Sequence, residues 1–367
     1  MVVRTFGLSL LVTVISLVIA FLYGGPAGLF VCTILAILEI SLSFDNAVMI
    51  ATVLERMNPF WQKMFLTIGV LIAVFGMRVL FPLVIVWATA DLAPREALLL
   101  ALNPPDPETP DNRSYETIMV AAHPQIAALG GMFLLMIFLD YAFDDDRQSW
   151  GRFVEHGLVR LGRVKHAAVV MAVAVLLIAG QVVDDDQRVA VYTSGLIGML
   201  LYLSIQGLTS LFDAHGPPGD EDRPAAELAP TRPQPVVVGG KAAFMLFLYL
   251  EMLDASFSFD GVIGAFAITS DPVLIALGLG FIGAMFVRSL TVYLVRAGTL
   301  TEYRYLENGA HWAIGALATI LLVSLKFEVN EVISGLAGVV FIGLAMVSSI
   351  RANRADHRAA HRAAGTP

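Results

Sequence analysis

The sequence feature that most constrains this chain is a pair of acidic residues inside a long apolar run. Residues 38–51 read LEISLSFDNAVMIA, so Glu39 and Asp45 lie within a hydrophobic stretch that covers residues 27–54. A charged side chain at the centre of a membrane helix costs about 2.5–3.5 kcal/mol on insertion scales. A chain therefore keeps such acids at membrane depth only where they are paired, neutralised or used.

The composition identifies the class of protein. Hydrophobic residues make up 57% of the 367 residues and charged residues only 15%, and the mean hydropathy is +0.76. Soluble domains carry about 25% charged residues, so we expect an all-α polytopic membrane protein in contact with the lipid bilayer. The formal net charge of −8 argues against a nucleic-acid partner. The single cysteine, Cys32, excludes an intramolecular disulfide.

Ten hydrophobic segments predict about ten transmembrane helices, since a bilayer requires about 20 residues per helix. The segments are residues 5–23, 27–54, 63–90, 125–143, 167–183, 189–212, 241–269, 272–297, 309–327 and 330–350. With both termini in the cytoplasm, 17 of the 23 Lys and Arg residues fall in inside segments. Only four fall outside, namely Arg95, Arg113, Arg188 and Lys326. This asymmetry predicts a multi-pass protein of the cell (inner) membrane with both termini cytoplasmic.

The same pass along the chain predicts six regions. They are an extra N-terminal transmembrane helix (1–24), a first repeat (27–143, motif helix 27–54), a connecting loop with two helices (144–212), a flexible cytoplasmic linker (213–240), a second repeat (241–350, motif helix 241–269) and a basic cytoplasmic tail (351–367). The linker prediction rests on a Pro-rich, polar composition that cannot bury a core. A long external loop is expected at residues 91–124.

The acidic motif recurs in the second half of the chain. Ser-Phe-Asp occurs at residues 43–45 and again at residues 258–260, and another acid precedes each aspartate by six residues, Glu39 in the first motif and Asp254 in the second. The motif helices are the second and the seventh of the ten segments, five positions apart in the order, so we expect them to cross the membrane in opposite senses. This pattern predicts two inverted-topology repeats whose acidic motif helices pack at the midplane, as in many transporters.

Helical geometry limits where these side chains point. Six residues along a straight helix leave two side chains about 120° apart, so Glu39 and Asp45 do not line one narrow face. Glu39, Ser43 and Asn46 do share a stripe. The equivalent positions of the second motif are Asp254, Ser258 and Gly261. Either the two Ser-Phe-Asp aspartates face a different neighbour, or the helices unwind at Ser-Phe-Asp.

The charge count favours a cation in the membrane. Five acids of the two motifs exceed two arginines of the following helices, so about three negative charges require protons or a cation if all groups ionise. Oxygen donors without Cys or clustered His suit hard ions such as Mn²⁺, Ca²⁺ or Mg²⁺. The predicted metal ligands are Glu39, Asp45, Asn46, Asp254 and Asp260, with Ser43, Ser258, Glu251, Arg78 and Arg288 in supporting positions. We expect no catalytic residue and no covalently bound cofactor.

At these residues the chain resembles the TerC-like integral membrane protein family, named for tellurium resistance, within the LysE-type transporter superfamily. It is most similar to a longer branch described only as a domain of unknown function. The motifs that support this resemblance are Glu39 with SFDNAVMIA, Glu251 and Asp254 with SFDGVIGAFAIT, and the arginines Arg78 and Arg288. The resemblance implies efflux of a divalent metal cation, chiefly manganese, from the cytoplasm.

Three functions stay open at this point. The first is a divalent-cation exporter that works by alternating access, with Mn²⁺ favoured, Ca²⁺ as the second choice and protons as exchange ions. The second is an exporter of small organic solutes of LysE type, and the third is a non-transporting membrane component of a metal or tellurite stress response. An intramembrane aspartyl protease, whose aspartates follow Tyr and Gly-x-Gly, does not match Phe-Asp-Asn and Phe-Asp-Gly. We therefore expect no enzyme.

Overall fold

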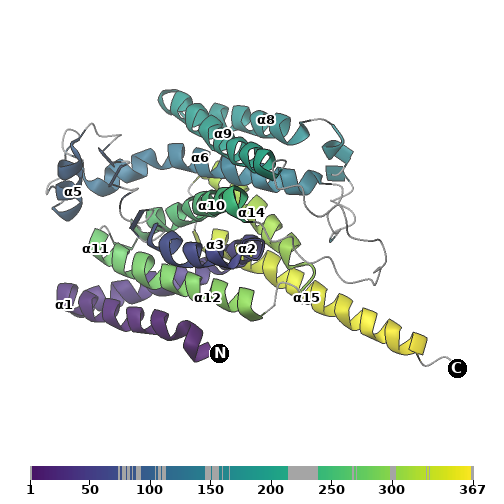
Figure 1. Ribbon diagram of the computed structural model, residues 1–367. Coiled ribbons are helices and arrows are strands. Elements are labelled where there is room, and N and C mark those ends of the chain that lie inside the picture. Colours follow the sequence, from purple (N-terminus) through teal and green to yellow (C-terminus); the bar gives the residue numbers. More distant parts are fainter. Residues whose placement is uncertain are drawn as a thin grey trace.

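The computed structural model is a bundle of α-helices (Figure 1). It describes residues 2–72, 75–76, 80, 83–84, 86–87, 92–103, 105, 109, 113–144, 150, 157–158, 160–164, 166–213, 239–266, 268–269, 271–297, 303–327, 329 and 331–364. Within these residues the chain forms twelve α-helices and two π-helical segments. The all-α prediction is confirmed.

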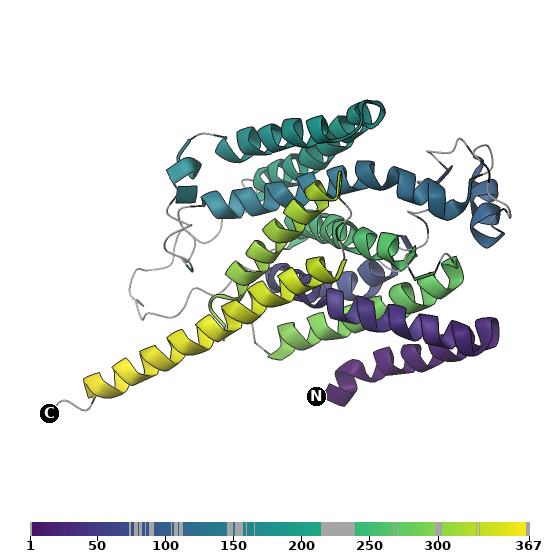
Figure 2. The ribbon, with the colours of Figure 1, turned by 180° about the vertical axis from the view of Figure 1, so that it is seen from behind.

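The chain begins with two helical legs that reverse direction at a glycine. The backbone of α1 (Val2–Leu42) turns at Gly25, which has φ 61° and ψ −152°, a region that is essentially restricted to glycine. Pro26 follows this turn. A Cβ atom on Gly28 would lie 2.7 Å from the carbonyl oxygen of Ala20, although residues eight apart on a straight helix are about 12 Å apart. The second leg therefore runs back beside the first, as Figures 1 and 2 show.

The remaining elements follow in chain order. They are α2 (Phe44–Leu54), α3 (Pro59–Met64), η1 (Phe65–Gly69), α5 (Pro94–Leu102), α6 (Tyr115–Phe143), α8 (Ala167–Val182), α9 (Asp185–Asp213), α10 (Gly240–Phe266), α11 (Pro272–Ile275), η3 (Ala276–Gly283), α12 (Ala284–Ala297), α14 (Leu306–Val323) and α15 (Glu331–Ala364). In Figures 1 and 2, α1 lies at one face of the bundle and α8 with α9 at the opposite face. The helices α2 and α10 lie between these faces. The first motif extends from Glu39 at the end of α1 to Asn46 in α2, and α10 contains the second motif.

Six described helices are long and apolar enough to cross a membrane, as expected for a multi-pass membrane protein. They cover Thr5–Ile40, Tyr115–Phe143, Asp185–Leu208, Pro272–Val295, Leu306–Val323 and Leu336–Asp356. The first of them contains the reversal at Gly25 and so combines two predicted segments. Three other predicted segments are not among the six: residues 63–90 fall partly outside the described residues, residues 167–183 form the shorter apolar helix α8, and α10 carries the acids of the second motif.

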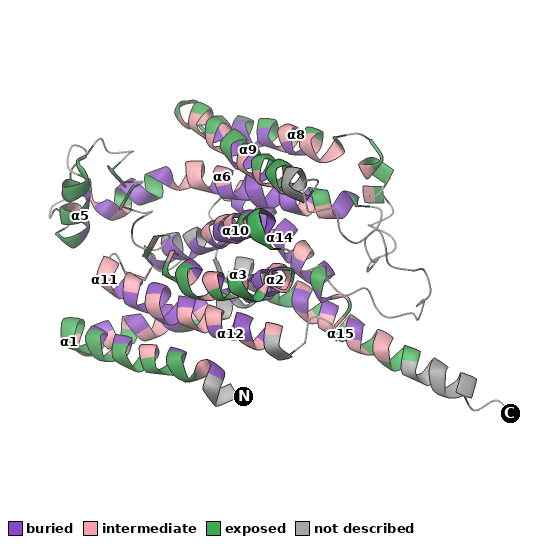
Figure 3. Cartoon of the chain, viewed as in Figure 1, coloured by how far each residue is buried: buried purple, intermediate pink, exposed green. Residues whose placement is uncertain are grey.

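The outer helices expose apolar side chains. Leu22 of α1, Ile178 of α8 and Val189 of α9 are 77%, 66% and 73% exposed. Figure 3 shows the exposed positions along these helices, which form the outer faces of the bundle. Exposed apolar area of this extent is unfavourable in water and favourable in a bilayer, so these faces contact lipid.

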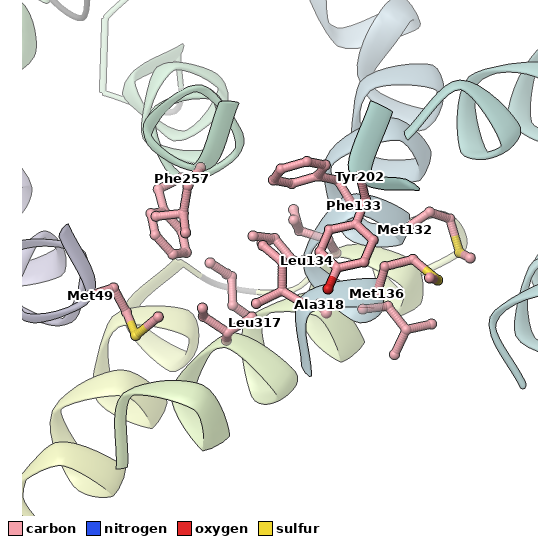
Figure 4. Close-up of a cluster of buried hydrophobic side chains, with 14 of the residues drawn as sticks. Met49, Met132, Phe133, Leu134, Met136, Tyr202, Phe257, Leu317 and Ala318 are labelled. Carbon is pink, nitrogen blue, oxygen red and sulfur yellow. The ribbon is translucent and has the colours of Figure 1, made fainter. Parts of the chain in front are cut away.

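The apolar sides of the two motif helices meet in the main core. Met49 of α2 and Phe257 of α10 point toward Leu317 of α14, and α6 supplies the next layer with Phe133 (Figure 4). Met49 is 1% and Phe133 is 0% exposed. This packing positions α2 and α10 relative to each other through their apolar sides, so that their polar stripes occupy another part of the interface.

Several predicted boundaries change in the structure. The helix predicted at residues 27–54 is divided at Ser43, which has φ −94° and ψ 12°, into the end of α1 and the start of α2. Backbone hydrogen bonds from Ser43 N to Glu39 O and from Ala47 N to Ser43 O continue across this point, so the helix bends there and does not unwind. In the second motif, α10 is continuous through Ser258 and Gly261.

The predicted loops also differ in part. The loop expected at residues 91–124 contains α5 and the first turns of α6. The tail expected at residues 351–367 continues α15 as far as Ala364. Of the predicted linker at residues 213–240, residues 214–238 lie outside the described residues.

The turn at Gly25 yields the first prediction. Gly25→Ala places a side chain at φ 61°, which costs about 1–3 kcal/mol, so the detergent-solubilised variant is expected to unfold at a lower temperature than the wild type. The matched control is Gly24→Ala, because a Cβ atom at Gly24 meets nothing within 4 Å and its φ is not positive. Equal thermal unfolding of the two variants would contradict the assigned turn.

Candidate functional site

The two motif helices lie side by side and run in opposite directions. At one end of the pair, a Cβ atom on Gly261 would lie 3.1 Å from Oε2 of Glu39. At the other end, Ile50 lines the same cavity as Glu251 and Asp254. Ile50 follows Glu39 by 11 residues, about 16 Å along a helix, and Gly261 follows Glu251 by 10 residues, about 15 Å. The polar stripes of the two helices therefore lie side by side over about the same length.

Glu39 is the carboxylate at the first end. Its side chain is 3% exposed, and the buried hydroxyl of Ser43 donates a hydrogen bond of 2.8 Å to Oε1. A Cβ atom on Gly283 would lie only 2.1 Å from Cγ of Glu39. Because glycines stand at positions 283 and 261, both η3 and α10 come into direct contact with this side chain.

Glu251 is the carboxylate at the second end. Its side chain is 7% exposed, and its Oε1 atom has no hydrogen-bond partner among the described residues. A Cβ atom on Gly69 would lie 2.6 Å from that oxygen. Glu251 also lines a cavity with about 20 Å³ of space for the centre of a water-sized sphere. A cavity of this size holds about one water molecule.

The two ends follow the same pattern with the halves exchanged. Glu39 in the first half lies against Gly283, the last residue of η3 in the second half, and Glu251 in the second half lies against Gly69, the last residue of η1 in the first half. Both π-helical segments follow a short helix that starts with proline. Short π-helical segments occur frequently at functional sites. By their contacts, Glu39 and Glu251 occupy equivalent positions in the two halves. The six-residue spacing before each aspartate instead makes Glu39 equivalent to Asp254.

Sequence reasoning missed these glycines, although a signal for them exists. Asn58-Pro59 and Asp271-Pro272 each begin a helix, and the side chains of Asn58 and Asp271 accept hydrogen bonds from the backbone of the first turn. Gly69 follows Asn58 by 11 residues, and Gly283 follows Asp271 by 12. An alignment of the two halves on these helix starts would have placed the two glycines at nearly equivalent positions.

Arg288 connects the second end to the first half. Its Nε atom donates a hydrogen bond of 2.8 Å to the carbonyl oxygen of Leu66, which joins α12 to η1. Arg288 and Asp254 both line the cavity at Glu251. The hydroxyl of Ser258 lies 3.5 Å from Oδ2 of Asp254 and extends the polar stripe toward Gly261.

The predicted site residues include some whose side chains the structure describes and some whose side chains it does not. The predicted site residues that the structure describes as buried are Glu39, Ser43, Asn46, Glu251, Asp254 and Ser258. Asp45 lies on α2 and Asp260 on α10, but their side chains, and all of Arg78, lie outside the described residues. Among the described residues, no group of three or more His, Cys, Asp or Glu side chains is placed to hold a metal ion. A ligand set that includes Asp45 and Asp260 therefore stays a prediction.

The contact between Gly283 and Glu39 yields the second prediction. Gly283→Ala places a methyl group 2.1 Å from Cγ of Glu39, near the root of the side chain, so η3 and α1 have to separate. Overpacking of this kind costs about 1–3 kcal/mol, and the thermal unfolding temperature in detergent should fall. Gly343→Ala in α15, where a Cβ atom meets nothing within 4 Å, should unfold as the wild type does. Unchanged unfolding of Gly283→Ala would show that this contact is not formed.

Comparison with known proteins places the second motif, and part of the first, within one family model. The family described as "Protein of unknown function (DUF475)" matches residues 44–356. The match contains the whole second motif and, in the first motif, Asp45 and Asn46, and it begins after Glu39. No curated protein and no solved structure matches the chain. The predicted membership of a family of unknown function is confirmed, and the wider likeness to TerC-like proteins stays a prediction.

Proposed function

Because the chain belongs to the DUF475 family and contains acidic motifs within its helical bundle, we propose that it is an integral membrane transporter of a divalent metal cation. The observation that supports this proposal is the burial of Glu39, Glu251 and Asp254, which are 3%, 7% and 8% exposed, among apolar helices. Buried carboxylates are stable only with compensating partners. In a membrane bundle they mark paths for ions or protons.

The donor atoms favour a hard cation. Around the first end the structure supplies a carboxylate from Glu39, and the hydroxyl of Ser43 and the side chain of Asn46 are buried on the same stripe. We assign the metal to this end, with Glu39, Asn46 and the aspartates Asp45 and Asp260 as ligands. Asp254, the fifth predicted ligand, lines the cavity at Glu251 and is not assigned to the metal here. Asp260 is adjacent in sequence to Gly261, which contacts Glu39. Such oxygen ligands suit Mn²⁺ and Ca²⁺, and the resemblance of the motifs to TerC-like proteins favours Mn²⁺ and export.

Alternating access requires two halves that move relative to each other. The carboxylate of each motif helix contacts the final glycine of a π-helical segment in the other half, so a shift between the halves changes both ends of the site together. A π-helical segment accommodates such a shift by returning to α-helical register. We infer an inverted-topology repeat in which each motif helix moves relative to the π-helical segment of the other half.

The third prediction tests the metal ligands. Glu39→Gln, Asp45→Asn and Asp260→Asn each remove one negative charge, and Gln at residue 39 keeps the acceptor for Ser43. In cells that lack their own manganese exporter, each variant should lower export by about 10–100-fold, as loss of a metal-site group does. The readout is cellular manganese measured by mass spectrometry after a manganese load, at matched amounts of protein in the membrane.

The matched controls are Asp184→Asn and Asp356→Asn, which neutralise side chains that are 77% and 66% exposed. They should export as the wild type does. Wild-type export by all three site variants would overturn the proposal. Altered export of basic amino acids with unchanged manganese content would favour the LysE-type function instead. Full metal tolerance with every site carboxylate neutralised would indicate a non-transporting role.

A further inference from the structure

The cavity at Glu251 lies apart from the residues assigned to the metal. It lies between four elements, α2, η1, α10 and α12, and its lining includes Ile50, Leu66, Gly69, Glu251, Asp254 and Arg288. Glu251 is about 15 Å along α10 from Gly261, where Glu39 makes contact. The cavity is therefore a separate position at the far end of the polar stripe.

Glu251 points an unsatisfied oxygen at this cavity. The Oε1 atom is buried and has no hydrogen-bond partner among the described residues, and the side chain is 7% exposed. Leaving a buried carboxylate oxygen without a partner is costly. The cavity beside it admits one water-sized guest, so a small ligand that donates to, or coordinates, this oxygen removes the cost.

The charges around the cavity define the guest. Asp254 lines it from α10 and Arg288 from α12, whereas the described lining residues of η1 and α2 are uncharged. With all three groups ionised, two carboxylates and one guanidinium leave one negative charge. The guanidinium donates through Nε to Leu66 O and so remains on the η1 side. Among the lining residues that the structure describes, one monovalent positive charge completes the balance.

A divalent metal fits this cavity poorly. Ca²⁺ takes 6–8 oxygen ligands and Mg²⁺ six, whereas the described side chains of the lining supply two carboxylates and the hydroxyl of Thr291. A divalent ion would also lie beside the Arg288 guanidinium and leave an excess positive charge. The cavity thus differs in chemistry from the end of the stripe at Glu39.

We propose that the cavity at Glu251 binds one monovalent positive charge, either a proton on Glu251 or Na⁺ between Glu251 and Asp254, and that this ion is exchanged for the metal. The last clause rests on the proposed transport function, and the binding itself does not. Antiparallel polar stripes connect the cavity with Glu39, so that occupancy of one end changes the field at the other. The two ions are exchanged if the metal at the Glu39 end and the monovalent ion at Glu251 are bound in alternate conformations of the protein.

The fourth prediction distinguishes coupling to the monovalent ion at Glu251 from transport of the metal itself. Full-length protein in proteoliposomes is tested for Mn²⁺ uptake driven by a pH gradient, by a Na⁺ gradient, or by neither in Mn²⁺/Mn²⁺ exchange. One gradient should accelerate uptake by the wild type relative to Mn²⁺/Mn²⁺ exchange, and Glu251→Gln should reduce this ratio of the two rates by about tenfold or more. The effective gradient identifies the proton or Na⁺ as the ion.

Gly69→Ala provides a second variant, in which residue 251 remains glutamate. The added methyl group would lie 2.6 Å from Glu251 Oε1, and the flexible end of that side chain has to move out of the cavity. The same loss of gradient-driven uptake is expected. Gly343→Ala, in open space on α15, is the matched control and should respond to the gradient as the wild type does.

The outcomes distinguish the two proposals. Wild-type gradient response in both Glu251→Gln and Gly69→Ala overturns the coupling site and leaves the transport function intact. If the wild type moves no Mn²⁺ in any arm, the proposed transport function is wrong. Proton or Na⁺ binding to the purified protein then tests whether the cavity is an ion site. A protonated-carboxyl infrared band, or a Na⁺-dependent rise in unfolding temperature, that Glu251→Gln abolishes supports the site. Absence of both from the wild type overturns it.

Discussion

The relative placement of the two halves depends on the contact between the buried carboxylate of Glu39 and the second half of the chain. A carboxylate removed from water is stable only when groups on every side compensate its charge or its hydrogen bonds. Here the Ser43 hydroxyl lies on the same helix, and η3 and α10 approach from the second half through Gly283 and Gly261. Any side chain larger than hydrogen at Gly283 would push η3 away. The charge thus requires close packing, and the glycine permits it.

The second half repeats this arrangement with one difference that bears on function. Glu251 lies against Gly69 as Glu39 lies against Gly283, each glycine ending a π-helical segment. Glu39 is hydrogen-bonded by Ser43, whereas Oε1 of Glu251 faces a small cavity without a partner among the described residues. Similar backbone surroundings therefore produce two different sites. The proposed binding of two unlike ions depends on this difference between Glu39 and Glu251.

Part of the site follows from periodicity along a single helix. Residues spaced by three and four share one face, which places Glu39, Ser43 and Asn46 on one stripe and Glu251, Asp254 and Ser258 on the other. All six are buried, as charged and polar groups of a packed membrane helix should be. The equivalence of Glu39 with Asp254 was also deduced from spacing, and here contact geometry selects Glu251. Spacing describes positions on one helix, whereas the partner of a side chain depends on the neighbouring helix.

The sequence by itself determined the all-α membrane class, the positions of the acids and most helices, because hydrophobicity and helical period are local properties of the chain. Only the tertiary structure decided that residues 2–42 reverse at Gly25, that α5 forms within the expected loop at residues 91–124, and that Gly69 and Gly283 contact the carboxylates. It also decided that a cavity lies beside Glu251. The two glycine contacts join residues 182 and 244 positions apart in the chain, and the distance between two helices is a property of both surfaces together.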